Sequence, residues 1–170
     1  MLITARLGLR PLPAAAAKAL PADRDAAARV LGASLSPDWP QPDLLDVLPL
    51  QAAVAPCNER FGIWTIIERE SRTVVGEVGF RGPPDRSGAV EIGYSVVPGR
   101  RKRGYATEAA RAVVEWALDQ PAVSVVLAGC DADNVASIRI LETIGFVRTG
   151  ETGGQIRWRY SGSALEEQNG

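Results

Sequence analysis

The chain has 170 residues, 46% of them hydrophobic, and its 19 Lys and Arg residues against 20 Asp and Glu residues give a net charge of -1. This size and apolar content predict one globular domain over residues 1–170 with a full hydrophobic core. The near-neutral balance excludes a global field that would draw the protein to nucleic acid or to a membrane surface, and no apolar run is long enough to span a bilayer. Histidine is absent, which excludes His-based triads and the usual zinc sites, so no metal is expected.

The first residues and the two cysteines indicate a compartment. Met1–Thr4 lacks the charged start and the long apolar stretch of a signal peptide. Cys57 and Cys130 are too few for a disulfide framework. We therefore expect a cytoplasmic protein whose two thiols are reduced and buried.

The first half of the chain predicts one strand followed by three helices, over Thr4–Leu12, Ala14–Leu20, Asp23–Leu31 and Asp43–Ala55. The two alanine-rich stretches have high helix propensity, with Asp23 as an N-cap and Gly32 as a stop. Prolines between residues 37 and 42 predict a loop, and Pro49 is expected to interrupt the third helix.

The second half has a clearer rhythm of strands and helices. Its expected strands are Gly62–Glu68, Thr73–Arg81, Gly88–Val97, Val123–Leu127, Phe146-Val147 and Gln155–Tyr160. Helical periodicity predicts helices over Gly104–Asp119 and Asn134–Ile144, the second of which ends at Gly145. Short turns favour an antiparallel meander, while the strand–helix–strand order around residue 110 predicts a crossover. The fold class is therefore α/β (α+β) with a mixed, mostly antiparallel sheet, in which Val123–Leu127 is buried on both faces.

A basic loop, Arg101–Ala106, lies between a predicted strand and a predicted helix. The free backbone N–H groups of a helix N-terminus favour an anion, and Arg and Lys side chains make a phosphate the natural guest. The loop is not a Walker loop, because Tyr105 stands where Lys is needed, and no Gly-x-Gly precedes the helix as in dinucleotide sites. A solvated turn and a nucleic-acid patch over Arg100–Arg103 are the alternatives; lack of interleaved aromatic residues disfavours the patch.

The loop and its flanking segments resemble a known family. Arg101-x-x-Gly104-x-Ala106 is similar to the pyrophosphate loop of the GNAT acetyltransferases, whose pattern is Gln/Arg-x-x-Gly-x-Gly/Ala. Glu91–Tyr94, Gly104–Ala109, Asn134-x-x-Ser137 and Gly145-Phe146 resemble the branch of ribosomal-protein N-terminal acetyltransferases, as does the opening Thr4–Pro11. The resemblance covers nearly the whole chain. It implies the GNAT fold, with a sheet of six to seven strands, helices on both faces and a central βαβ cofactor unit.

The resemblance also implies a cofactor and the residues that hold it. Acetyl-CoA would place its pyrophosphate on the backbone N–H groups of the loop, and its pantetheine arm would add to the strand that ends at Val97. The backbone N–H of Ser95 resembles the donor that polarises the thioester carbonyl. The implied cofactor-binding residues are Ser95, Val96, Val97, Arg101, Lys102, Arg103, Gly104, Tyr105, Ala106, Thr107, Asn134 and Ser137.

The chemistry expected at such a site is attack by an amine on a thioester, which requires that a proton be removed. Glu91 resembles the position of the base in some family members; the alternative is a structural carboxylate. Leu141 stands where many members carry the tyrosine that protonates the departing thiolate, and Ser137 is the substitute suggested by the ribosomal-protein branch. The alternative for Ser137 is a helix-start serine beside Asn134.

The acceptor is the least defined part of the prediction. The resemblance implies a primary amine, either a protein N-terminus or a small amine, near Trp39, Pro40 and the segment 150–158. Trp39, Trp64 and Trp158 either line this cleft or pack in the core. A CoA-binding regulatory or assembly domain without catalysis is the second hypothesis, because the usual tyrosine is missing. Neither nucleic acid nor a membrane is expected as a partner, and a homodimer remains open.

Overall fold

A mixed sheet is built from strands in both halves of the described chain. The computed structural model describes residues 1–54 and 56–162. The helices are α1 (Ala14–Ala19), α2 (Arg24–Leu31), α3 (Pro42–Ala52), α4 (Tyr105–Leu118) and α5 (Val135–Ile144), with 3-10 turns η1 (Pro56–Phe61) and η2 (Pro98–Arg100). The strands are β1 (Leu2–Ile3), β2 (Leu7–Pro11), β3 (Ser34–Leu35), β4 (Ile63–Glu68), β5 (Thr73–Phe80), β6 (Ala89–Val96), β7 (Val125–Asp131), β8 (Val147–Thr152) and β9 (Gln155–Tyr160).

The strand order confirms the predicted crossover. In the described residues the sheet has nine strands in the order β1-β2-β4-β5-β6-β7-β9-β8, with β3 paired to β5. The β6–β7 and β3–β5 pairs are parallel and the other pairs are antiparallel. Since α4 connects β6 to β7, this part of the chain is the βαβ unit. The strand count exceeds the expected six to seven mainly because β1 and β3 are two-residue strands that leave no periodic pattern.

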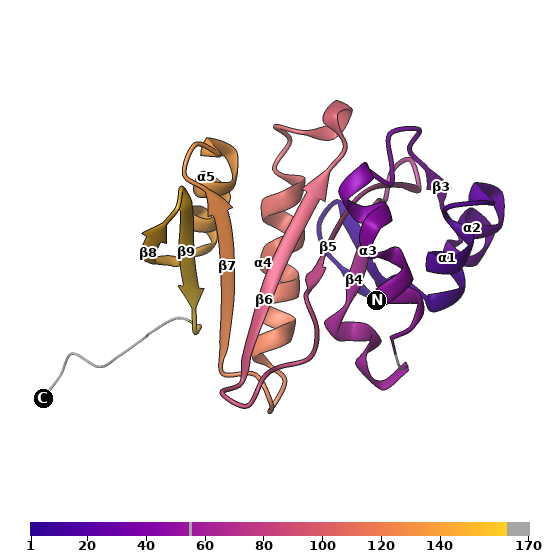
Figure 1. Ribbon diagram of the computed structural model, residues 1–170. Coiled ribbons are helices and arrows are strands. Elements are labelled where there is room, and N and C mark those ends of the chain that lie inside the picture. Colours follow the sequence, from indigo (N-terminus) through magenta and orange to yellow (C-terminus); the bar gives the residue numbers. More distant parts are fainter. Residues whose placement is uncertain (55, 163–170) are drawn as a thin grey trace, which may run out of the picture.

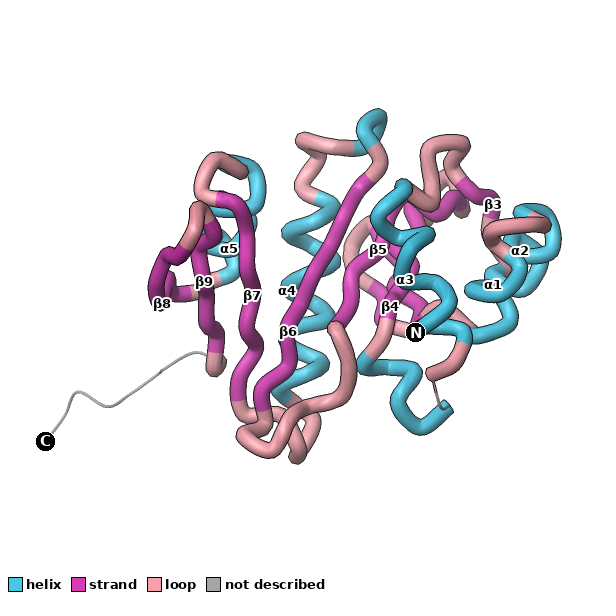
Figure 2. Tube along the Cα trace, in the orientation of Figure 1, coloured by secondary structure: helices cyan, strands magenta, loops and turns pink. Residues whose placement is uncertain are grey.

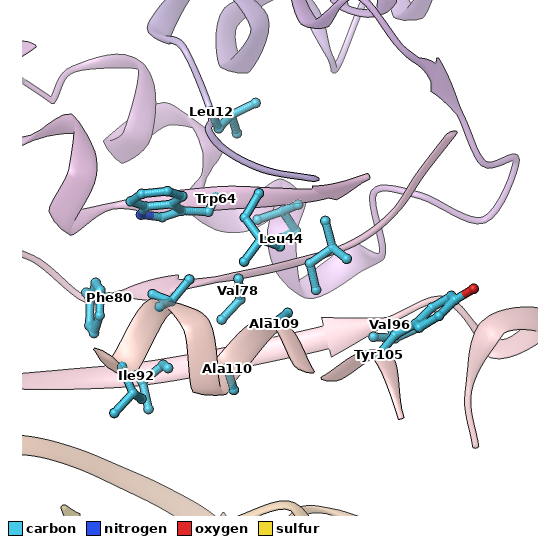
Figure 3. Close-up of a cluster of buried hydrophobic side chains, with 14 of the residues drawn as sticks. Leu12, Leu44, Trp64, Val78, Phe80, Ile92, Val96, Tyr105, Ala109 and Ala110 are labelled. Atoms are coloured by element: carbon cyan, nitrogen blue, oxygen red, sulfur yellow. The ribbon is translucent and has the colours of Figure 1, made fainter. Parts of the chain in front are cut away.

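Helices cover both faces of the sheet. Figure 1 shows α4 behind β6 and α3 in front of β4, and Figure 2 shows the same layers by secondary structure. In Figure 3, Trp64, Val78 and Phe80 of the sheet lie beside Ala109 and Ala110 of α4. Both alanines are at most 1% exposed, so small side chains let this helix pack closely on the strands.

The helix ends follow the predicted capping residues, with one exception. The Asp23 carboxylate accepts a hydrogen bond from Ala26 N, and Gly32 and Gly145 adopt left-handed conformations at the ends of α2 and α5. The expected interruption at Pro49 is wrong, since α3 continues to Ala52. The buried Gln51 side chain donates to Leu12 O and accepts from Ile63 N, which holds the last turn against the sheet and offsets the lost helical bond.

Two burial predictions are corrected. Strand β7 is not buried on both faces, because buried and exposed residues alternate along it and Leu127 is 37% exposed. Cys57 is exposed, whereas Cys130 is buried as expected. Within residues 1–54 and 56–162, no helix combines the length and apolarity that crossing a membrane requires.

The two edges of the sheet are short or irregular. Strand β1 contributes two residues to one edge. At the other edge every residue of β8 is exposed, and its pairing with β9 shifts register between Arg148 and Gly150. Arg148 forms an ion pair with Glu151 on this strand.

Candidate active site

A gap opens between the parallel strands β6 and β7. Their pairing begins at Ala89 with Val125 and ends at Ile92 with Ala128. Strand β6 nevertheless continues to Val96 and β7 to Asp131, and the two strands diverge towards the top of Figure 1. Backbone groups of β6 beyond Ile92 are therefore not paired with β7, and an extended amide-rich chain can add to such groups as a strand does.

The register of β6 decides which backbone groups face this gap. Val97 N donates to Val75 O at 2.9 Å and Arg81 N donates to Glu91 O at 3.1 Å, so the odd-numbered residues of β6 bond to β5. The N–H of Ser95 is consequently directed at β5, and the expectation that it serves as the thioester donor is wrong for this geometry. The N–H groups of Tyr94 and Val96 face the gap instead.

The loop from Val97 to Gly104 brings free backbone donors to the top of this gap. Lys102 has φ 60 and Gly104 has φ 80, and α4 begins without a side-chain cap. In the described part of the chain, the backbone N–H groups of residues 102–107 have no protein acceptor. Consecutive unpaired donors of this kind suit a phosphate.

The four basic side chains of the loop, Arg100–Arg103, make different contacts. Arg100 Nε lies 3.2 Å from Glu68 Oε1. Arg101 Nε donates to Val96 O at 2.9 Å, and its Nη2 lies 3.4 Å from Gln41 Oε1. Lys102 and Arg103 are exposed and form no ion pair within the described residues, although the Arg103 side chain also bonds the Tyr105 hydroxyl, so their charges are available to an anion.

Tyr105 anchors the loop to the sheet rather than pointing at the phosphate site. Its hydroxyl donates to Glu68 Oε1 at 2.7 Å, and Arg6 stacks on its ring at 4.7 Å. Hydrogen bonds from Ser71 and Tyr105, together with Arg100, lower the pKa of the buried Glu68 carboxyl despite its burial. Ala106 and Thr107 follow in the first turn of α4, where their contribution is the backbone N–H.

The N-terminus of α5 faces Tyr94 across the gap. Asn134 Oδ1 accepts from Ser137 N at 3.1 Å, so Asn134 caps the helix and Ser137 contributes its backbone N–H to that cap. Burial raises the pKa of Tyr94 to about 12, and a hydrogen bond with the Ser137 side chain opposes that shift. Leu141 is 1% exposed and lies in the core. Tyr94 and Ser137 are therefore the hydroxyl groups beside the gap.

Glu91 lies on the opposite face of the sheet from Tyr94. Its Oε1 is 3.4 Å from Arg81 Nε, and its side chain is 28% exposed. The same oxygen is 4.0 Å from the position that a Cβ at Gly129 would occupy, so the carboxylate extends over β7 where the gap opens. A carboxylate in this place is accessible to an acceptor that approaches from the α3 side.

Comparisons with known proteins agree with this geometry. The family model described as an acetyltransferase (GNAT) domain matches residues 6–147. An N-acetyltransferase of Bacillus subtilis, YjdG, named as uncharacterized, is 32% identical over 137 residues, covering 79% of this chain and 82% of that protein. The chain belongs to the GNAT acetyltransferase family. It is therefore an acyltransferase, with acetyl-CoA as the donor.

Two solved structures illustrate the shared fold. An acetyltransferase from Agrobacterium tumefaciens is 26% identical with a TM-score of 0.64, covering 94% of this chain and 92% of that one. RimL, a ribosomal L7/L12 α-N-protein acetyltransferase solved with coenzyme A, is 16% identical with a TM-score of 0.67, covering 94% and 96%. At that identity, the likeness to RimL shows the GNAT fold alone.

A hollow of about 770 Å³ opens on the α3 face of the acetyltransferase sheet. Its lining includes Asp43 of α3, Glu77 of β5, Arg81, and Gly93 and Ser95 of β6. Burial raises the pKa of Glu77 to about 7, with a contribution from Asp43, although the hydrogen bond from Trp39 opposes the shift. Sequence analysis missed Glu77; its signal is a single charged residue inside the apolar strand Thr73–Phe80.

The three tryptophans proposed for an acceptor cleft lie in the core. Trp39, Trp64 and Trp158 are at most 3% exposed. Trp39 Nε1 donates to Glu77 Oε2 at 2.6 Å, Trp64 Nε1 to Arg60 O, and Trp158 Nε1 to Cys130 Sγ at 3.3 Å. Their role is packing and support, which confirms the alternative reading of these residues.

Proposed function

We propose that residues 1–170 form one GNAT domain that transfers an acetyl group from acetyl-CoA directly to a primary amine, either a protein N-terminal amine or a small amine. The observation that carries this proposal is the run of unpaired N–H groups at residues 102–107 beside the β6–β7 gap. Such a run fits a pyrophosphate, and the gap fits the arm that extends from it.

The loop and both sides of the gap would hold acetyl-CoA, which supplies the activated acetyl group when bound. The N–H groups of residues 102–107 would receive the pyrophosphate, with the Lys102 and Arg103 side chains around it. The N–H groups of Tyr94 and Val96 face the gap, where they can bond the pantetheine arm and the thioester carbonyl. Asn134 and Ser137 stand across the gap at the start of α5.

The catalytic residues act on protons and orientation. Glu91 remains our candidate base at the mouth of the gap, although Arg81 shares its Oε1. We expect the Ser137 hydroxyl, which lies beside Tyr94, to donate to the departing sulfur. The thiolate is a good leaving group, so we expect positioning to supply a large part of the rate.

The resemblance to ribosomal-protein acetyltransferases and the cytoplasmic location belong to the same proposal. The resemblance rests on the motifs around Glu91, Gly104 and Ser137, and RimL, named as a ribosomal L7/L12 α-N-protein acetyltransferase, shares the fold. The location rests on the first residues and on the two cysteines. A CoA-binding domain without catalysis is the competing function, and the buried Leu141 in place of tyrosine is the observation that favours it.

The test is release of free thiol from acetyl-CoA across a panel of small amines and N-terminal peptides. We expect micromolar binding of acetyl-CoA by calorimetry and acceptor-dependent thiol release with at least one amine class. Binding without turnover on any acceptor would favour the regulatory domain. Absence of binding at micromolar cofactor would overturn both functions.

A further inference from the structure

Glu77 is a carboxylate that the mechanism above does not use. One of its oxygens, Oε2, accepts the 2.6 Å hydrogen bond from Trp39 Nε1. The other, Oε1, has no hydrogen-bond partner among the described residues. In the described residues, every side-chain oxygen that is fully buried has a hydrogen-bond partner. Because Oε1 has none, it is not fully buried, and since Glu77 lines the hollow this oxygen is accessible from there. The structure therefore presents one fixed, free carboxylate oxygen to whatever enters this space.

The position of Glu77 places that oxygen one strand away from the gap. Glu77 pairs with Ser95 in the β5–β6 ladder, so the two Cβ atoms are about 5 Å apart on the same face. Ser95 lies between Tyr94 and Val96, whose N–H groups face the gap. Glu91 is on the same face of β6, beyond Gly93, and a Cβ at Gly93 would meet no atom within 4 Å. Glu77, Gly93 and Ser95 line the same hollow, which therefore extends from Glu77 to the strand that borders the gap.

The rest of the hollow is apolar. Its walls include Leu44, Val47 and Leu50 of α3, together with Phe61, Ile63 and Pro83. A volume of about 770 Å³ is in the range of small-molecule sites, which combine apolar walls with a few polar groups. The chemistry that complements one free carboxylate oxygen and apolar walls is a primary ammonium group attached to an apolar body.

We propose that Glu77 receives the ammonium group of the acceptor and takes its proton, and that the acceptor is a small primary amine whose apolar body lies in the hollow under α3. This inference rests on the proposed acetyl transfer and assigns its acceptor side, with Glu77 in place of Glu91 as the base for this acceptor. Glu77 is then a catalytic residue, since it touches the reacting nitrogen, and Trp39 is the positioning residue that fixes its carboxylate.

The transfer replaces a C–S bond by an N–C bond and moves two protons. The ammonium group gives one proton to the Glu77 carboxylate, which passes it to solvent through the open hollow. The freed nitrogen lone pair forms the N–C bond with the thioester carbonyl carbon, and the C–S bond breaks. The second proton of the nitrogen goes to the departing sulfur, so the products are an amide, a free thiol and one released proton.

The charged groups around Glu77 are few. Asp43 of α3 lies close enough to raise the pKa of its carboxyl, and Arg81 and Glu91 form their pair at the far end of the hollow. Arg101 approaches Gln41, whose Oε1 also accepts from Ser95 Oγ at 2.8 Å. Glu77 pairs with Thr65 of β4, and Thr65 pairs with Arg10 of β2. The Arg10 guanidinium is one strand further away and donates to Leu31 O. These groups leave Glu77 able to change protonation near neutral pH.

The experiment compares kcat/KM for 2-phenylethylamine and ethanolamine, with saturating acetyl-CoA, in the wild type, Glu77→Gln and Asp43→Asn. We expect 2-phenylethylamine to be preferred at least tenfold, because ethanolamine carries the same ammonium group without the apolar body. Glu77→Gln should lower kcat/KM by about 100-fold, in the range of general-base losses, and remove an acid limb near pH 7. Asp43→Asn should keep that limb, moved to lower pH because the Asp43 charge no longer raises the pKa of Glu77, and lose less than tenfold.

Gly93→Val supplies an independent arm, since a Cβ at this position would meet no atom within 4 Å and the added side chain would take up space in the hollow. We expect it to weaken 2-phenylethylamine binding to the CoA-saturated protein, measured by calorimetry. The midpoint temperature of thermal unfolding should be unchanged, and the affinity for CoA should stay within twofold of wild type. Turnover of peptides with Ala or Ser first, unaffected by Glu77→Gln and Gly93→Val, would overturn this inference and leave acetyl transfer standing. Normal 2-phenylethylamine turnover and pH profile in Glu77→Gln would also overturn it. If no acceptor were acetylated and calorimetry showed no binding of 2-phenylethylamine, both this inference and the proposed acetyl transfer would be overturned.

Discussion

The β6–β7 gap and the hollow under α3 meet at Ser95 but are built in different ways. The gap is made of backbone: two strands that stop pairing at Ile92 and a loop whose N–H groups are unpaired. The hollow is made of side chains from α3, η1, β5 and β6, which are far apart in the sequence. Backbone geometry tolerates exchange of most side chains, whereas the hollow changes with each residue that lines it.

In the functions proposed above, this difference separates a donor site made of common backbone geometry from an acceptor site made of this chain's own side chains. The loop requires a glycine in the left-handed conformation at position 104 and a helix that begins without a side-chain cap. Both features lie within the six residues Arg101–Ala106. The hollow depends on Glu77, held by Trp39, which is 38 residues away in sequence. We therefore expect perturbations of the two regions to have separable effects, on acetyl-CoA in one case and on the acceptor in the other.

The largest effect should come from a pair of glycines that face each other on β5 and β6. A Cβ at Gly79 would lie 2.3 Å from Gly62 O, whereas one at Gly93 would meet nothing within 4 Å. We predict that Gly79→Ala lowers the free energy of unfolding by about 3 kcal/mol, while Gly93→Ala changes it by less than about 0.5 kcal/mol. Urea denaturation of both variants measures this, and equal losses would show that the floor of the hollow is not open at Gly93.

The next effect is a dependence of stability on pH at Glu77. Its pKa is raised from 4.5 to about 7, so between these values the folded protein holds a proton that the unfolded chain has released. The wild type should therefore lose stability as the pH rises from 4.5 to 7, by up to about 3 kcal/mol. Glu77→Gln should remove that loss and be more stable than wild type at pH 8 but not at pH 4.5. If the free energies of unfolding of the two proteins changed with pH in parallel, the raised pKa of Glu77 in the folded protein would be contradicted.

The smallest predicted effect sharpens the donor side. Replacing Lys102 and Arg103 together with Ala should weaken CoA about tenfold, because both side chains are exposed beside the free N–H groups. The loss should shrink at high salt and should be absent for a phosphate-free pantetheine fragment. Arg86→Ala, which removes an exposed charge from the turn before β6, is the matched control. Equal weakening of CoA and of the fragment would argue against the phosphate role.

Local signals in the sequence predicted most of the helices and strands. Asp23, Gly32, Asn134 and Gly145 mark helix ends through their own side chains or backbone freedom, so their role does not depend on the rest of the fold. The parallel β6–β7 pair followed from the strand–helix–strand order. The family resemblance, carried by the segments around the loop, is confirmed by the match over residues 6–147.

Long-range packing decided what the sequence did not predict. The direction of the Ser95 N–H depends on the register of β6 against β5, which a motif does not specify. Pro49 is accommodated because Gln51 is held by Leu12 and Ile63, two residues outside its helix. The importance of Glu77 becomes visible only when Trp39 and α3 are in place, although its charge within an apolar strand was a signal.

The irregular edges of the sheet bear on how the protein behaves at high concentration. An exposed strand with a long, flat ladder can template pairing with another chain and lead to aggregation. Here one edge is the two-residue strand β1, and the other is β8, with its register shift and its Arg148–Glu151 pair. Neither offers a regular row of backbone groups, so these edges protect a strongly β-structured molecule against uncontrolled fibre-like assembly.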